Sequence, residues 1–335
     1  MGVALALETV MKRKSIHRKF YKWALCLFMV GAPAFVEANT RALVITGLGG
    51  NVEYNASFGE HSDAITEALR TLTAEPESVV HLVGETANRE TFLSTMNKVV
   101  EEANELSESS NEIDTFVLIM IGHGNVNRSG WQFNVSGPDI SVQDLVGALA
   151  PLNVGHEVIV AAASASGDLL EPLTQAGRTL VTATKSGGEL NAVRFTQYFA
   201  AAMASDEADV DRNELLTVQE AFTFANNATQ HYYTEQKLLA SEHARFASPN
   251  NTTTTIATLG ALRDAKNNPA IAALLDKRSL LEEAFYEVKA SKSTRDSDEY
   301  YRELEEVLVE IATLQQTIDA TLRESDSTSE SESIE

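Results

Sequence analysis

Short apolar runs alternate with amphipathic stretches along residues 40–230. Five runs are apolar throughout and rich in β-branched residues, at 41–46, 78–83, 114–121, 157–162 and 179–184. Between several of them, apolar side chains recur at helical spacing, as in 58–72 and 89–106. A strand that is apolar on both sides is buried on both faces. The alternation therefore predicts an α/β domain, with a parallel sheet covered by helices on both faces.

The first forty residues have a different pattern, in which a basic stretch precedes a short apolar run. Basic residues lie between Lys12 and Lys22, residues 23–34 are apolar, and Val36 and Ala38 offer small side chains to a signal peptidase. We interpret residues 1–38 as the signal peptide of an exported protein, periplasmic or secreted, starting at Met1 or Met11. The alternative is an uncleaved membrane anchor, although the run is shorter than the ~20 residues that span a bilayer.

Composition narrows the possible partners and chemistry. The 335-residue chain has a formal net charge of −22. This charge argues against a nucleic-acid partner, which requires a basic surface. The chain has a single cysteine, Cys26, inside the predicted signal peptide. After cleavage the protein would therefore have no thiol for a disulfide, a thiolate metal site or a nucleophile.

Two predicted strand ends carry side chains suited to chemistry. The third apolar run leads into His123-Gly124, and the fourth is followed by Ser164 in a turn of small residues. Ligands bind beyond the carboxyl ends of the strands of a parallel sheet. A histidine and a hydroxyl at adjacent strand ends form a nucleophile–base pair in outline, and the Gly124 amide could donate to an oxyanion.

This pair of strand ends resembles the legumain and caspase class of cysteine peptidases. In that class one strand ends in His-Gly, and the next major strand ends in a Glu-Ala-Cys-x-Ser-Gly-like motif. Residues 42–230 are similar to the class in strand order and in the separation of the two motifs. The resemblance implies a caspase-like fold, with His123 as the catalytic histidine, Gly124 as the oxyanion amide and Ser164 at the nucleophile position. The chain departs from the class at Ser164, which replaces cysteine, and at Ala162, which replaces glutamate.

The departures decide the functional hypotheses. A serine hydroxyl is far less acidic than a thiol and requires a base in direct contact, oriented by a third group. The sequence shows no acid evidently placed to orient His123. We therefore expect a catalytically inactive or atypical exported relative that binds a peptide or protein or acts as a scaffold. One alternative is a serine-dependent peptidase or esterase that uses Ser164 and His123. Another is an assembly protein that acts through its C-terminal helices.

Residues 209–220 follow the spacing of an EF-hand calcium loop. Positions one, three, five, seven and twelve hold Asp209, Asp211, Asn213, Leu215 (through its carbonyl) and Glu220. Glu214 occupies the sixth position, where the sharp turn favours glycine. The segment is either a Ca²⁺ site or an acidic turn that caps the helix after it.

The C-terminal third has a different organisation. A polar stretch closes the α/β pattern, so we place that domain at 39–248 and a linker at 249–265. Residues 266–322 contain two heptad-like runs separated by a charged break, which predict an antiparallel helical hairpin or coiled coil. The hairpin could pack on its own domain, pair with a second chain in a homo-oligomer, or bind a partner. The acidic residues 323–335 predict a disordered tail.

Overall fold

The computed structural model describes residues 40–73, 75–107, 115–249, 254–264, 269–293 and 295–332. The predicted signal peptide and Cys26 lie outside these residues. All described elements belong to one unit, Glu37–Glu335. Among the helices of the described residues, none is both long enough and apolar enough to cross a membrane.

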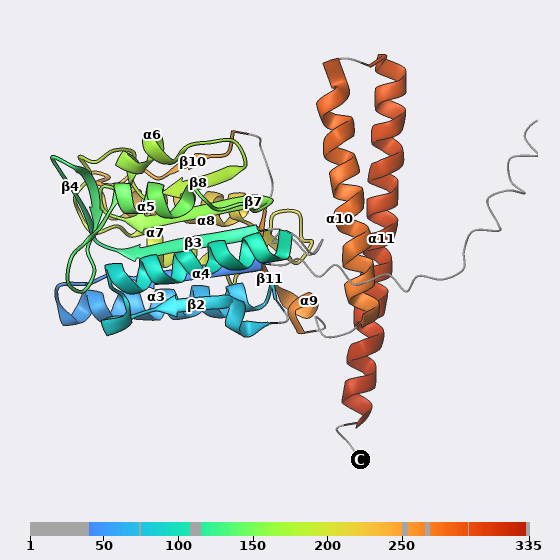
Figure 1. The fold of residues 1–335 in the computed structure, drawn as a ribbon. Coiled ribbons are helices and arrows are strands. Elements are labelled where there is room, and N and C mark those ends of the chain that lie inside the picture. Colours follow the sequence, from blue (N-terminus) through green and yellow to red (C-terminus); the bar gives the residue numbers. More distant parts are fainter. Residues whose placement is uncertain are drawn as a thin grey trace, which may run out of the picture. The chain divides into compact units, whose positions relative to one another are not determined.

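A six-stranded sheet forms the centre of the domain, in the order β10-β8-β7-β3-β1-β2 (Figure 1). The strands are β1 (Thr40–Thr46), β2 (Val79–Leu82), β3 (Thr115–Gly122), β7 (His156–Ala163), β8 (Arg178–Thr182) and β10 (Arg245–Ala247). All neighbours pair in parallel except β10, which is antiparallel to β8. The predicted α/β class with a mainly parallel sheet is therefore confirmed.

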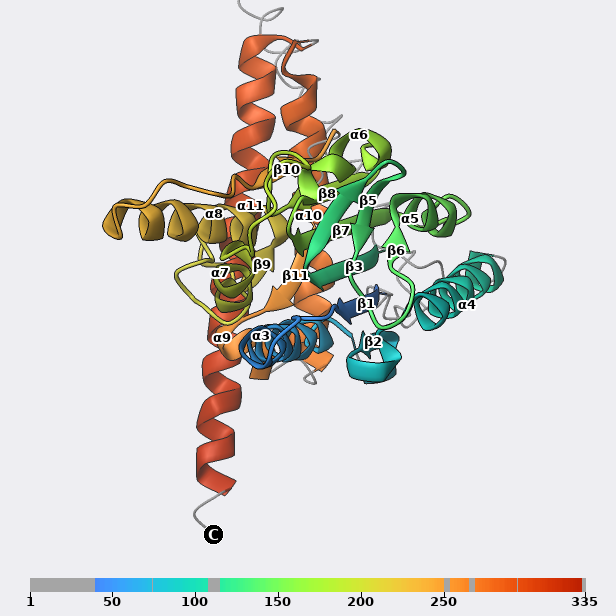
Figure 2. The ribbon, with the colours of Figure 1, turned by 90° about the vertical axis from the view of Figure 1, so that its left-hand side faces the viewer.

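Helices cover both faces of the sheet. On one face lie α3 (Val52–Arg70), α7 (Phe195–Ala202) and α8 (Val218–Glu235); on the other lie α4 (Arg89–Ser107), α5 (Val142–Leu149) and α6 (Leu170–Leu173) (Figure 2). Alternate residues of β1 enter different cores: Val44 packs with Phe58 and Phe199, whereas Leu43 packs with Phe92. This period of two explains why the strands read as apolar throughout.

Short elements connect the layers. Directly after β3, a small antiparallel sheet contains β4 (Gly124–Asn127), β5 (Gly130–Phe133) and β6 (Ile140–Ser141). The chain also contains four short 3₁₀ turns in its described part: η1 (Pro76–Ser78), η2 (Gly84–Thr86), η3 (Ser166–Leu169) and η4 (Ser291–Ser293). The Ser141 side chain accepts a hydrogen bond from the Asp144 amide and so caps α5.

The segment predicted as a linker contains regular structure. Strand β11 (Thr255–Thr258) pairs antiparallel with β9 (Leu215–Thr217), and α9 (Gly260–Asp264) follows. Both elements are anchored because Ile256 and Leu262 are buried. Three apolar residues in a Thr-rich stretch were too few to indicate a strand.

The C-terminal helices are α10 (Pro269–Ala290) and α11 (Ser297–Glu332), which contact each other. Ile271, Leu314 and Ile318 share a core cluster with Leu262 and Leu215, so the hairpin packs on its own domain. Its pairing with a second chain stays a prediction. Helix α11 runs to Glu332 and so includes most of the predicted tail. A helix that is already nucleated propagates through further residues at little cost.

Candidate functional site

The ends of β3 and β7 bring His123-Gly124 and Ser164 together. Gly122 and Ala163 form the last pair between β3 and β7, and His123 and Ser164 are the next residue after each strand. A Cβ atom built on Gly124 would lie 2.5 Å from the Ser164 carbonyl oxygen. The same carbonyl accepts a hydrogen bond of 3.1 Å from the indole Nε1 of buried Trp131. The structure thus places all three predicted residues at one edge of the sheet.

The imidazole of His123 is oriented by aromatic rings and by a backbone group. Its centroid lies 5.0 Å from that of Tyr54 and 5.1 Å from that of Phe58, both in edge-on geometry. Burial lowers the pKa of His123, and a hydrogen bond with the Gly49 backbone opposes this shift. Among the described residues, the ring contacts that orient His123 come from the aromatic side chains of Tyr54 and Phe58, which a search for acids could not find.

The hydroxyl of Ser164 is sealed in the turn after β7. The residue is 1% exposed. Its Oγ is buried and has no hydrogen-bond partner in the described part of the chain. His123 therefore does not contact it as a base. The arrangement has the placement of a nucleophile–base pair but lacks the hydrogen bond through which a base activates a hydroxyl.

A loop at residues 183–194 packs beside Ser164 and is held by Glu189. The Glu189 carboxylate accepts hydrogen bonds from the backbone N–H groups of Lys185 (2.9 Å) and His243 (3.1 Å), and His243 Nδ1 lies 2.5 Å from it. Burial by itself would raise the pKa of Glu189, but these hydrogen bonds outweigh it and lower the pKa. Sequence reasoning missed this contact because no spacing links residues 189 and 243.

A second carboxylate, Glu242, caps the helix that follows this loop. Glu242 is buried and accepts hydrogen bonds from the backbone N–H groups of Arg194 (2.8 Å) and Phe195 (3.0 Å) and from the Tyr233 hydroxyl (2.9 Å). Burial raises the pKa of Glu242, although its donors oppose the shift. A carboxylate at a helix N-terminus is favourable because the free N–H groups there are partly positive.

One hydroxyl–histidine–acid chain among the described residues joins the end of β1 to β2 and α3. The Thr46 hydroxyl lies 3.0 Å from His81 Nε2, and His81 Nδ1 lies 3.5 Å from the Asp63 carboxylate. Burial lowers the pKa of His81, while Asp63 opposes the shift. Thr46 is buried between the sheet and α3. Its hydroxyl has no open approach for a substrate, so we interpret this chain as structural.

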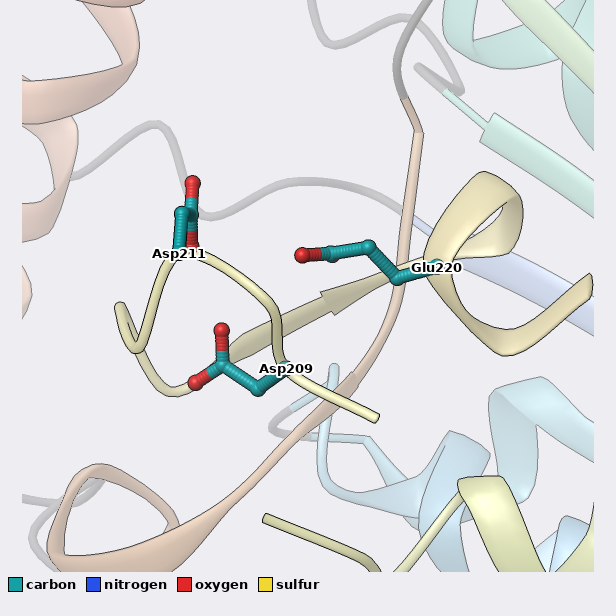
Figure 3. A group of neighbouring side chains, drawn as sticks. All are labelled: Asp209, Asp211 and Glu220. Atoms are coloured by element: carbon teal, nitrogen blue, oxygen red, sulfur yellow. The ribbon is translucent and has the colours of Figure 1, made fainter. Parts of the chain in front are cut away.

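The predicted calcium loop brings three carboxylates together. Ligand oxygens of Asp209, Asp211 and Glu220 all lie within 4.8 Å of one another (Figure 3). Arg212 and Glu214, at the fourth and sixth positions, have φ angles of 56° and 61°. Burial and the neighbouring charges of Glu220 and Asp209 raise the pKa of Asp211 to about 6.

The remaining loop positions are engaged in hydrogen bonds within the loop. The Asn213 amide donates to Asp211 (2.8 Å) and accepts from the Leu215 N–H (2.7 Å). Glu220 forms a capping box with Thr217 at the start of α8, so the alternative prediction of a helix cap is confirmed, whereas Ca²⁺ binding stays a prediction. Glu214 fits its turn because its carboxylate accepts from the Leu262 N–H (2.6 Å) in α9.

The calcium-like loop also touches the C-terminal hairpin. Arg278 of α10 is buried, and its guanidinium donates to the Asn213 carbonyl (3.2 Å), to Gln315 of α11 (2.7 Å) and to Glu282 (2.8 Å). Gln315 is the polar residue in the apolar seam of α11, and Arg278 is its partner. The hairpin is thus tied to the domain by a polar contact as well as by apolar packing.

Comparisons with known proteins do not place the chain in a family. No model of a known protein family matches the sequence, and neither does any curated protein. The residues at the strand ends and in the 209–220 loop are therefore the basis for assigning a function.

Proposed function

We propose that the chain is a non-catalytic protein of the legumain and caspase type that binds a peptide at the strand-end edge of its sheet. One observation carries this proposal: the Ser164 hydroxyl is buried and has no hydrogen-bond partner among the described residues, so the His123 ring does not contact it as a base. A serine nucleophile needs its base in direct contact. The structure of this edge favours binding over hydrolysis.

The type of fold is proposed from the resemblance and from the placement of its motifs. His123-Gly124 and the small-residue turn at Ser164 follow adjacent parallel strands, β3 and β7, as the resemblance implies. Ala162, at the position of the expected glutamate, is fully buried in β7. A glutamate there would place a carboxylate in the apolar core, so the substitution agrees with a site that does not perform chemistry.

Exposed apolar side chains at the same edge support peptide binding. Leu48 follows β1 and is 47% exposed, Val126 lies in β4 after the end of β3 and is 38% exposed, and Leu190 follows β8 and is 62% exposed. The carboxyl ends of parallel strands share one edge, so these side chains lie in segments that follow the strand ends near His123. Apolar side chains on loops at a strand-end edge are typical of binding sites.

A serine-reactive probe separates binding from hydrolysis. The full chain is incubated with a fluorophosphonate probe, and adducts at residue 164 are measured by mass spectrometry, with Ser164→Ala as the matched control. We expect no adduct at Ser164. An adduct that disappears in Ser164→Ala would instead establish the serine-dependent peptidase or esterase.

Peptide binding is tested directly with a positional-scanning library of fluorescein-labelled, end-capped tetrapeptides, read by anisotropy. We expect saturable binding of a subset with apolar side chains, weakened about tenfold or more in Val126→Asp, since burying an unpaired carboxylate is costly. Val309→Asp places the same charge on an exposed valine of α11 and should leave binding unchanged. Equal effects of the two variants, or no binding of any library member, would overturn the peptide-binding role.

A second proposed function is divalent-cation binding by the 209–220 loop, favoured by the three carboxylates within 4.8 Å. The donor set fits Ca²⁺, which prefers carboxylate and carbonyl oxygens, and Asp209, Asp211, Asn213, Leu215 and Glu220 would hold it. The discriminating variant is Glu220→Gln, because glutamine can still form a capping box but has no charge. Calorimetric Ca²⁺ titration should show one site, weakened in Glu220→Gln without loss of metal-free stability. If Glu220→Gln gives the same titration heat as the wild type, or if no heat is measured at millimolar Ca²⁺, this loop acts as a helix cap and not as a Ca²⁺ site.

A further inference from the structure

Two segments far apart in the sequence hold each other by reciprocal carboxylate contacts. Glu189, in the loop after β8, accepts from the backbone N–H of His243 (3.1 Å) and lies 2.5 Å from its Nδ1. In the reverse direction, Glu242 accepts from the N–H groups of Arg194 (2.8 Å) and Phe195 (3.0 Å), where α7 begins. Hydrogen bonds to ionised groups are about twice as strong as neutral ones. We call residues 242–243 the strap and residues 183–194 the site loop.

The site loop is seated directly on the turn that carries Ser164. The Ala165 N–H donates to the Glu189 carbonyl at 2.8 Å. Glu189 therefore binds this turn through its backbone and the strap through its side chain. Gly167 lies so close to the loop that a Cβ atom there would be 2.0 Å from the Ser186 nitrogen. The strap therefore fixes the element that packs on the Ser164 turn.

The Ser164 hydroxyl is buried and has no hydrogen-bond partner among the described residues in this closed arrangement. Such a group is destabilised relative to a state in which it is hydrogen-bonded, and each buried unsatisfied polar atom calls for an explanation. The site loop also contains Gly187-Gly188, whose backbone freedom suits a segment that moves.

We infer that the site loop is a gate over residue 164, which the strap holds closed and whose release opens the strand-end edge. The inference rests on the proposed function in taking this edge as the binding site. It predicts that residue 164 exchanges between a sealed and an accessible state, and that the strap contacts set the fraction of the accessible state.

Thiol labelling of Ser164→Cys measures this exchange without any peptide. The full-length variant is treated with iodoacetamide, and modification of residue 164 is followed by peptide mass spectrometry, which separates it from Cys26. Labelling should be at least about 100-fold slower than in Val52→Cys, a position that is 86% exposed. Adding His243→Ala or Glu242→Gln should accelerate it about tenfold or more, since the first removes the side-chain contact with Glu189 and the second removes the charge that strengthens the hydrogen bonds to Arg194 and Phe195.

Two controls distinguish gate opening from general destabilisation. His231→Ala removes an exposed histidine–glutamate pair of 3.0 Å on α8 and should leave the labelling rate unchanged. Ser62→Cys reports on a fully buried position of α3, and its rate should not respond to His243→Ala. The gate is refuted if Ser164→Cys labels as fast as Val52→Cys, if the strap variants have no effect, or if they accelerate Ser62→Cys equally. Accelerated labelling together with no peptide binding would reject the proposed function but retain the gate.

Discussion

Substitution of Gly124 by alanine tests what the glycine beside His123 contributes. The added Cβ atom would lie 2.5 Å from the Ser164 carbonyl oxygen and 2.6 Å from Trp131 Nε1. Neither neighbour can move freely, because the carbonyl ends β7 and the buried indole donates to that same carbonyl. Overpacking of a core costs about 1–3 kcal/mol. The lost indole hydrogen bond adds about 1 kcal/mol, so we expect Gly124→Ala to lower the free energy of unfolding by ~2–4 kcal/mol.

The measurement is urea unfolding of the full chain at 25 °C, followed by tryptophan fluorescence. Trp131 is fully buried and stacks on Phe133 with ring centroids 5.8 Å apart, so its emission reports on this edge. Gly188→Ala is the matched control, because its nearest new neighbour is the Ser186 hydroxyl at 3.6 Å, an ordinary contact. We expect the control to change the unfolding free energy by less than about 0.5 kcal/mol.

A stability loss below about 0.5 kcal/mol in Gly124→Ala would refute the packing explanation. Alanine retains the backbone N–H, so a glycine needed only for its amide would tolerate the change. The expected loss would therefore mean that close approach of β4 to the turn after β7 requires glycine here, whether or not an oxyanion is ever bound.

Further predictions concern the C-terminal hairpin, the loss of stability at acidic pH and the 209–220 loop. Arg278→Leu should lower the free energy of unfolding by about 2–4 kcal/mol, because it removes three hydrogen bonds of a buried guanidinium and leaves their part-buried acceptors unpaired. Hydrogen exchange of α10 and α11 should accelerate, and unchanged exchange would contradict the anchoring role. Asp144→Asn tests pH dependence: hydrogen bonds from Arg89 hold the pKa of Asp144 at about 2, below the ordinary 3.8, so its stabilisation is present above about pH 4 and lost as pH falls to 2. The stability difference between wild type and Asp144→Asn should shrink across that window, and a constant difference would refute the linkage. Glu214→Ala loses the side-chain hydrogen bond to Leu262 and keeps the strained positive φ, whereas Glu214→Gly relieves that strain. Urea unfolding should therefore show the glycine variant to be more stable than the alanine variant by about 1 kcal/mol. Equal stabilities of the two variants would exclude backbone strain at this position.

The main sheet was predictable because burial on both faces leaves a local mark in the sequence. Strand β3 is buried at every position and reads as an unbroken apolar run. Strand β10 gives no such signal, since it has three residues and none of them is buried. Strand β11 lies in a Thr-rich stretch where Ile256 is the one large apolar residue, and only its pairing with β9 reveals it.

The candidate site was predictable in its placement but not in its contacts. Adjacent strand ends bring His123 and Ser164 to one edge by topology alone. The contacts of the His123 ring with Tyr54 and Phe58 join residues far apart in the sequence, and no local pattern specifies them. The Glu189–His243 contact joins residues 54 positions apart, and no periodicity specifies a pairing at that distance.

The two departures from the peptidase motif are physically consistent with each other. Ala162 is fully buried and its carbonyl accepts from the Thr196 hydroxyl of α7 at 3.2 Å, so the β7 end is closed against that helix. Ser164, two residues later, is equally sealed. A reactive thiol at 164 would need an accessible, electropositive environment, which this turn does not provide. On the proposed function, restoring cysteine alone would supply a nucleophile without access, because the strap holds the site loop on the turn that carries residue 164.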